Sequence, residues 1–146
     1  MDPISVTASV IAIATVAAQV STAFAELRKD CSELPGRLHA LSNEVADIEF
    51  VLHQVAAVLQ ERNFLSDSDK ESIPTLLVQA DAKLKDLKDI IGRLSGNCTA
   101  RKILLRASAW RKWQPKLQDL QVDIRAIKCS LNVLLGASNS YVKSVS

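Results

Sequence analysis

Residues 4–25 read ISVTASVIAIATVAAQVSTAFA, and this stretch of 22 residues contains no charged side chain. The rest of the chain is highly charged, because the 146 residues include 18 Lys and Arg and 16 Asp and Glu. As an α-helix the stretch would be about 33 Å long, enough to cross a hydrocarbon layer about 30 Å thick. Its length therefore permits a role in a membrane.

The composition of this stretch leaves three interpretations open. As a transmembrane anchor it is marginal, because its strongly apolar side chains favour insertion by only about 2 to 5 kcal/mol and seven Ser, Thr and Gln residues oppose it. As a secretory signal it has a small-x-small site at Ala23 to Ala25, but Asp2 stands where such signals carry basic residues. As a bundle helix it has apolar residues spaced alternately by four and three: Val6, Val10, Ile13, Ala17, Val20, Phe24 and Leu27.

The opposite side of this predicted helix, which spans about residues 3–29, is also apolar. The solvent side of a bundle helix normally carries charges, and a helix that is apolar nearly all round is either deeply buried or used in another environment. We therefore predict a membrane-insertion or oligomerisation surface formed by Ile4, Ala8, Ile11, Ala12, Ala14 and Ala18.

Three further stretches show the same spacing of apolar residues, at 34–59, 73–94 and 113–134. Polar residues, Glu44 and Asp47 among them, lie off these stripes, and no stretch of comparable length alternates like a β-strand. The length suits one domain, and helices joined by short connections favour an antiparallel bundle. We predict an all-α bundle of four to five helices over residues 1–136.

Proline and glycine residues mark the expected helix ends. Pro35 and Gly36 separate the first two stripes, and Gly96 follows the third. Pro115 falls inside the last stripe, where proline kinks or splits a helix. We therefore expect a short helix over about 100–113, a longer one that ends at Gly136, and a frayed tail or linker over 137–146.

The two halves of the chain carry opposite charge. Residues 26–89 hold thirteen acidic and eight basic residues, whereas residues 90–146 hold ten basic and two acidic residues. Such a basic region with two Trp residues suits an anionic lipid surface, nucleic acid, or simply a solvated face with Trp in the core. No nucleic-acid motif accompanies it, so we predict an anionic-lipid or partner patch formed by Arg101, Lys102, Arg106, Arg111, Lys112 and Lys116.

Catalytic chemistry has little support in the sequence. His39 and His53 have no Cys, Ser or carboxylate arranged with them as a triad or a ligand set, and the four glycines form no phosphate-binding loop. Three widely separated cysteines favour a reducing compartment and small, partly buried side chains. We expect no enzymatic activity, no metal and no cofactor.

Three segments together resemble a known family. Residues 1–12 (MDPISVTASVIA), residues 38–45 (LHALSNEV) and the late run from Trp110 through Lys116 to LNVLL at 131–135 are similar to the fungal N-terminal domain of STAND proteins. These are NLR-like receptors, and the domain is often called HeLo-like. The resemblance covers nearly the whole chain.

The resemblance implies a helical cell-death domain that precedes a nucleotide-binding domain or ankyrin repeats. It implies a cytoplasmic protein that oligomerises on activation and relocates to the plasma membrane through its N-terminal helix, in programmed cell death, innate immunity or heterokaryon incompatibility. The alternative is a helical self-association or adaptor domain without membrane activity. We expect self-association and an anionic membrane as partners, and we do not expect nucleic acid.

Overall fold

A computed structural model describes the backbone of residues 3–30, 35–61, 67–96 and 107–145, and the side chains of residues 6–29, 35–61, 71–95 and 110–136. The described chain forms four helices and no strand: α1 Pro3–Asp30, α2 Gly36–Gln60, α3 Asp67–Gly96 and α4 Ala107–Val145. The prediction of an all-α helical bundle is therefore confirmed.

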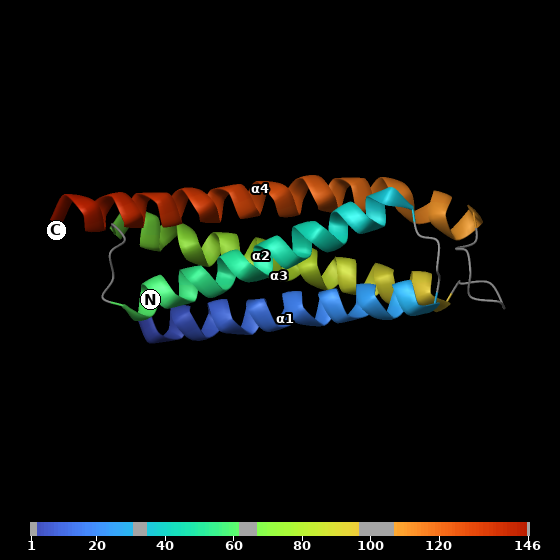
Figure 1. Ribbon diagram of the computed structural model, residues 1–146, viewed down its shortest axis with the longest axis horizontal. Helices are drawn as coiled ribbons and strands as arrows, with labels where there is room; N and C mark the ends of the chain where they lie inside the picture. The colour runs from blue at the N-terminus through green and yellow to red at the C-terminus, as the bar shows by residue number, and fades with distance from the viewer. Residues whose placement is uncertain (1–2, 31–34, 62–66, 97–106, 146) are drawn as a thin grey trace.

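The four helices run alternately in opposite directions along one long bundle (Figure 1). α1 packs against α2 and α3, and α4 packs against the same two helices. Within the described residues α1 makes no contact with α4, so these two helices lie diagonally opposite each other. α1 begins and α4 ends at the same end of the bundle (Figure 1).

The core consists of the apolar stripes that the sequence predicts. Phe24 and Leu27 from α1, Leu52 from α2 and Leu84 from α3 are all fully buried in it. On α4, the six apolar residues of the predicted stripe that run from Leu117 to Leu134 are buried, and Trp113 packs at the edge of the core. A helix alone in water is marginally stable, so burial of these stripes supplies most of the stability of the bundle.

α4 differs from the prediction in two ways. It passes through Pro115 as one helix, and it continues beyond Gly136 to Val145. Pro115 lies on the exposed side of the helix, so the carbonyl of residue 111, which loses its intrahelical partner, faces water. Trp113 and Leu117 pack on the core on either side of Pro115 and hold the two parts in line. The residues expected to start this helix, 100–106, lie outside the described part of the chain.

Candidate functional site

The outer face of α1 is the site that the sequence predicts most directly. Ile11 is 43% exposed, Ala8 and Ala12 are exposed, and Ala18 is half-buried. The placement of Ala14 on this face is wrong, because only 1% of it is exposed. Ala14 follows Val10 by four residues and precedes Ala17 by three, so it belongs to the buried stripe. The side chain of Ile4 lies outside the described residues.

A shallow groove continues this apolar face onto α3. It has a volume of about 300 Å³ and is lined by Ser9, Ala12, Ile13, Pro74, Leu77, Val78 and Asp81. Val78 is a large apolar side chain that is mostly exposed at the rim of the groove. Pro74 and Val78 could not be predicted as part of this site, because single apolar residues on the polar side of α3 give no periodic pattern.

Hydrogen bonds within α1 reduce the polarity of its surface. The hydroxyl groups of Thr15 and Thr22 donate to the carbonyls of Ile11 and Ala18, at 3.0 and 3.1 Å. α1 is also long and apolar enough to cross a membrane over Val6–Lys29, with a mean hydropathy of 1.7. The core helix of a soluble bundle can pass the same test, so this property alone does not assign a function.

Within the described residues, side-chain hydrogen bonds join α1 to both of its neighbours. Lys88 donates a hydrogen bond of 2.9 Å to the Gln19 side chain, and Arg28 donates one of 3.5 Å to Ser42. No ion pair involves any charged side chain that the structure describes in α1. The Ser21 hydroxyl is buried and has no partner among the described residues. Apolar packing therefore provides most of the attachment of α1.

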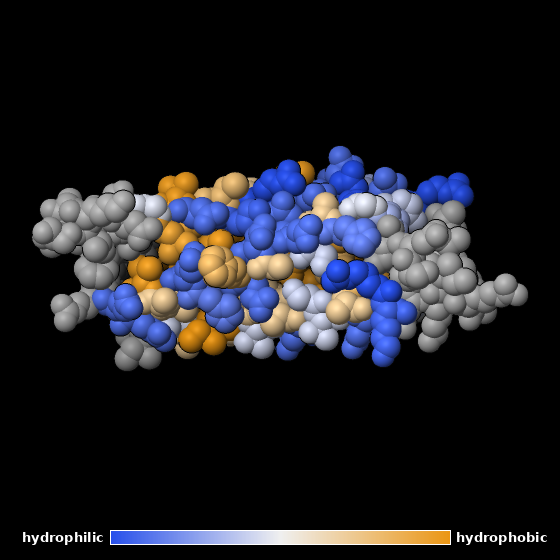
Figure 2. Space-filling view, in the orientation of Figure 1, coloured by the Kyte–Doolittle hydropathy of each residue, from blue (hydrophilic) through white to orange (hydrophobic). Residues whose placement is uncertain are grey.

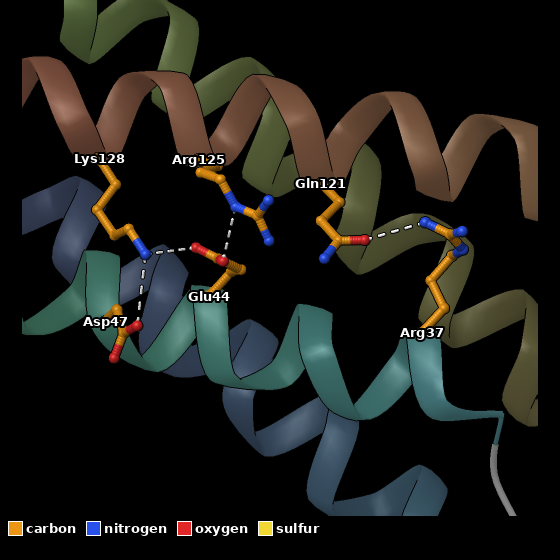
Figure 3. Close-up of polar contacts among 6 residues, drawn as sticks. All are labelled: Arg37, Glu44, Asp47, Gln121, Arg125 and Lys128. Carbon is orange, nitrogen blue, oxygen red and sulfur yellow. Dashed lines mark hydrogen bonds and ion pairs between the residues drawn. The ribbon is translucent and has the colours of Figure 1, made fainter.

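α2 and α4, in contrast, are joined by an ionic cluster (Figure 3). The buried Glu44 carboxylate accepts hydrogen bonds from Lys128 Nζ at 2.6 Å and from Arg125 Nε at 3.1 Å. Lys128 also lies 3.4 Å from Asp47. Further along the same interface, the Arg37 guanidinium donates to the Gln121 side chain at 3.0 Å.

The ionic cluster shifts the pKa values of its members. Burial opposes the ionisation of Glu44, but the hydrogen bonds and charges of Lys128 and Arg125 outweigh it and hold its pKa below the ordinary value. The hydrogen bond to Glu44 raises the pKa of Lys128 despite partial burial. The prediction that Glu44 lies off the buried stripe is wrong, because Glu44 is buried and its spacing of three from Leu41 and four from Ile48 fits that stripe.

Ion pairs connect α3 to α4 as well. Lys83 pairs with Asp123 at 3.1 Å, and Lys116 lies 3.9 Å from Asp86. Each pair is partly exposed, so each contributes little alone. Together with the Glu44 cluster, however, they tie α4 to both of its neighbours. The bundle thus combines an ion-paired unit of α2, α3 and α4 with an α1 that is attached mainly by apolar contacts.

Only part of the predicted basic patch lies within the described residues. Arg111, Lys112 and Lys116 are exposed on α4, whereas Arg101, Lys102 and Arg106 lie outside the described side chains. The Lys112 ammonium is 5.1 Å from the centre of the half-buried Trp113 ring, and the Arg93 guanidinium of α3 is 5.6 Å from it. Arg93 therefore adds to the patch, although the sequence alone does not place it beside Trp113.

The described residues contain no group of His, Cys, Asp and Glu side chains that could hold a metal ion. Cys129 is exposed, so the expectation of a partly buried side chain is wrong for this residue. Cys31 and Cys98 lie outside the described residues.

Comparison with known proteins identifies the family of the chain. No curated protein and no solved structure matches the chain significantly. The family described as pigment biosynthesis cluster protein PigL N-terminal matches residues 1–145, almost the whole chain, and the chain therefore belongs to this family.

Proposed function

We propose that the chain is an N-terminal signalling and execution domain of an NLR-like (STAND) receptor, related to the HeLo-like domains. In this proposal the cytoplasmic bundle stores α1. On activation the domain oligomerises and α1 moves to the plasma membrane, where it causes regulated cell death. The family description names the N-terminal part of its namesake, which suits a domain that precedes others. The proposal assigns no catalytic step to this domain.

The observation that carries the proposal is the contrast between α1 and α4. Separation of α4 from the bundle would leave the Glu44 carboxylate without its cationic partners, which is costly for a buried charge. Separation of α1 leaves no described charge without its ionic partner, and it frees the buried Ser21 hydroxyl to find a hydrogen-bond partner. α1 is therefore the helix that can leave with the least electrostatic cost.

The apolar surface exposed by such a separation needs a new environment. Lipid tails and the α1 helices of other copies both offer one. Insertion of one copy is favoured by only about 2 to 5 kcal/mol from its strongly apolar side chains, so we propose that several copies act together. The internal hydrogen bonds of Thr15 and Thr22 support this role, because they satisfy two hydroxyl groups without water.

The basic residues would direct the domain to anionic membranes. Arg111, Lys112 and Lys116 are exposed on α4, and each cation near such a surface contributes about 1 kcal/mol. Trp110 and Trp113 are half-buried in the same region, and Trp favours the headgroup zone of a bilayer.

One observation favours the alternative of an adaptor domain without membrane activity. The groove between α1 and α3 is already open on the folded bundle, so it can accept a protein partner while α1 stays in place. This alternative predicts self-association in solution without any binding to lipid.

Substitution of Ile11 tests the proposal. An acid at the centre of a bilayer costs about 2.5 to 3.5 kcal/mol, so Ile11→Glu should weaken vesicle binding about a hundredfold and abolish membrane localisation in cells. The matched control is Phe50→Glu, which changes a side chain that is 64% exposed on α2 and should bind as the parent does. Circular dichroism should show that both variants stay folded.

Two measurements separate the alternatives. Vesicle co-sedimentation reports lipid binding, and analytical ultracentrifugation without lipid reports self-association. If the Ile11→Glu variant binds vesicles and localises as the parent does, the outer face of α1 is not the membrane-binding surface. A parent chain that associates with itself but never binds vesicles would favour the adaptor domain.

A further inference from the structure

The outward face of α4 carries an apolar stripe without charge. Val122 is 61% exposed and Val133 is 71% exposed, and Ala126 and Cys129 are exposed between them. These four residues are spaced by four, three and four, so they share one side of the helix. They are separate from the buried stripe that faces the core. The middle of α4 therefore presents apolar surfaces on two opposite sides.

The pattern of large and small side chains in this stripe is the same when it is read from either end of the helix. A large residue stands at each end, Val122 and Val133, and a small residue stands at each inner position, Ala126 and Cys129. An interface between two identical copies related by a two-fold axis must be complementary to itself. In an antiparallel pair of α4 helices centred between Ala126 and Cys129, Val122 of each copy meets Val133 of the other, and the small residues allow close approach.

We propose that this stripe, Val122, Ala126, Cys129 and Val133, is the contact surface of an antiparallel, two-fold symmetric dimer of this chain. It lies on the helix diagonally opposite α1. The dimer would therefore leave the outer face of α1 accessible, and it does not depend on the proposed membrane function.

Charged side chains flank the stripe on both sides. Asp119 and Asp123 lie on one side of it, and Arg125 lies on the other side. In a two-fold pair each side of the stripe meets the same side in the second copy, so the two Arg125 residues share one side, five residues or about 7.5 Å apart along the axis. Asp123 and Arg125 also have ion-pair partners within their own copy, Lys83 and Glu44. The pairing creates no unpaired charge at these positions.

The surface beside the stripe is hollowed on the side of α3. One groove of about 420 Å³ is lined by Ala126, Ser130 and Ile127 of α4 and Leu76 and Gln79 of α3, among others. A second groove of about 730 Å³ shares Leu76, Gln79 and Ser130 and reaches Val133 and Leu134. Side chains of the second copy can therefore pack beside the stripe without displacing the bundle.

The size of the stripe sets the expected affinity. The stripe from Val122 to Val133 is about 16 Å long. With about one further turn at each end, from Gln118 to Gly136, the contact is about 27 Å long and about 10 Å wide, so α4 alone buries roughly 300 Å² per copy. A standard stable interface buries about 800 Å² per partner. We therefore expect a weak, reversible dimer that forms at high local concentration, and a covalent trap is the suitable test.

Paired cysteines in a chain with Cys31, Cys98 and Cys129 changed to Ser test the register. Val122→Cys combined with Val133→Cys should form a disulfide-linked dimer, because these positions face each other across the two-fold axis. Each single variant should stay monomeric, because its two copies are separated by 11 residues, about 16 Å along the helix, too far for a disulfide. Efficient linking by either single variant, or none above background by the double variant, would overturn the proposal.

A charge in the centre of the stripe provides a test without cross-linking. Ala126→Glu should bring two carboxylates together at the axis and abolish the concentration-dependent increase in sedimentation. The matched control, Ala82→Glu, changes an exposed alanine on the outer side of α3 and should leave that increase intact. An unchanged increase in the Ala126→Glu variant would contradict the proposed interface.

Discussion

Replacement of Lys128 by Met tests whether the ionic cluster fastens α4 to α2. The change removes the 2.6 Å hydrogen bond to Glu44 and the weaker contact with Asp47, while the methionine chain preserves most of the apolar contacts. Loss of one partner of a fully buried pair costs 3–5 kcal/mol. Arg125 remains beside Glu44, so we expect a smaller loss of about 1 to 3 kcal/mol in the free energy of unfolding.

Urea denaturation followed by far-ultraviolet circular dichroism measures this loss. The double variant Glu44→Leu with Lys128→Met should recover most of the stability, because it buries no unpaired charge. The two single variants and the double variant together form a cycle that isolates the interaction. A loss below about 0.5 kcal/mol for Lys128→Met, the value typical of an exposed pair, would refute the reasoning that this cluster is a buried constraint.

Three further predictions concern pH, lipid and the docking of α1. Folding lowers the pKa of Glu44. The ionised Glu44 therefore stabilises the bundle above its unfolded pKa of about 4.3, and this stabilisation is lost as the pH falls through the folded pKa. Glu44→Gln should flatten this decline on the acid side, as measured by denaturation at a series of pH values. Changing Arg111, Lys112 and Lys116 together to Gln should weaken binding to phosphatidylserine vesicles roughly a hundredfold, in a salt-sensitive co-sedimentation assay. Ser21→Ala should stabilise the bundle by about 1 kcal/mol in urea denaturation, because it removes a buried hydroxyl without a partner.

The regular parts of the fold could be predicted from the sequence because the core is built from repeated spacing. Residues such as Val10, Ile48, Leu84 and Ile124 are buried where the alternation of three and four places them. The end of α4 could not be predicted in this way. Gly136 is a common helix terminator, yet the helix continues to Val145, and local propensity gives only a weak indication of helix ends.

The candidate site was harder to predict, because it depends on how many neighbours each helix has. α1 packs against both α2 and α3, so the buried part of its circumference is wide enough to include Ala14. Contacts between distant segments, such as Glu44 with Lys128, combine residues from different helices, and no spacing within one helix reveals them. For the same reason Val78 becomes part of an apolar surface only when α3 is placed beside α1.

The stripe on α4 shows a related difficulty. Val122 and Val133 belong to the same helix as the buried stripe, but they lie on its other side. The strongest apolar pattern in each helix predicts the side that faces the core, and the other residues are then expected to face water. Only the exposed fractions of the two valines reveal that a second apolar surface exists.

The most direct test of the central proposal is to lock α1 in the bundle. In the chain with Cys31, Cys98 and Cys129 changed to Ser, Gln19 and Lys88, whose side chains meet across α1 and α3, are both replaced by Cys. A bismaleimide with a reducible linkage then joins them. The control joins Arg37 and Gln121 across α2 and α4 in the same way.

The measurement is binding to anionic vesicles before and after reduction of the linker. We predict that the lock between α1 and α3 abolishes binding and that reduction restores it, whereas the lock between α2 and α4 has no effect in either state. Full binding by the protein with α1 locked, or equal inhibition by both locks, would contradict the proposal that α1 leaves the bundle to reach the membrane.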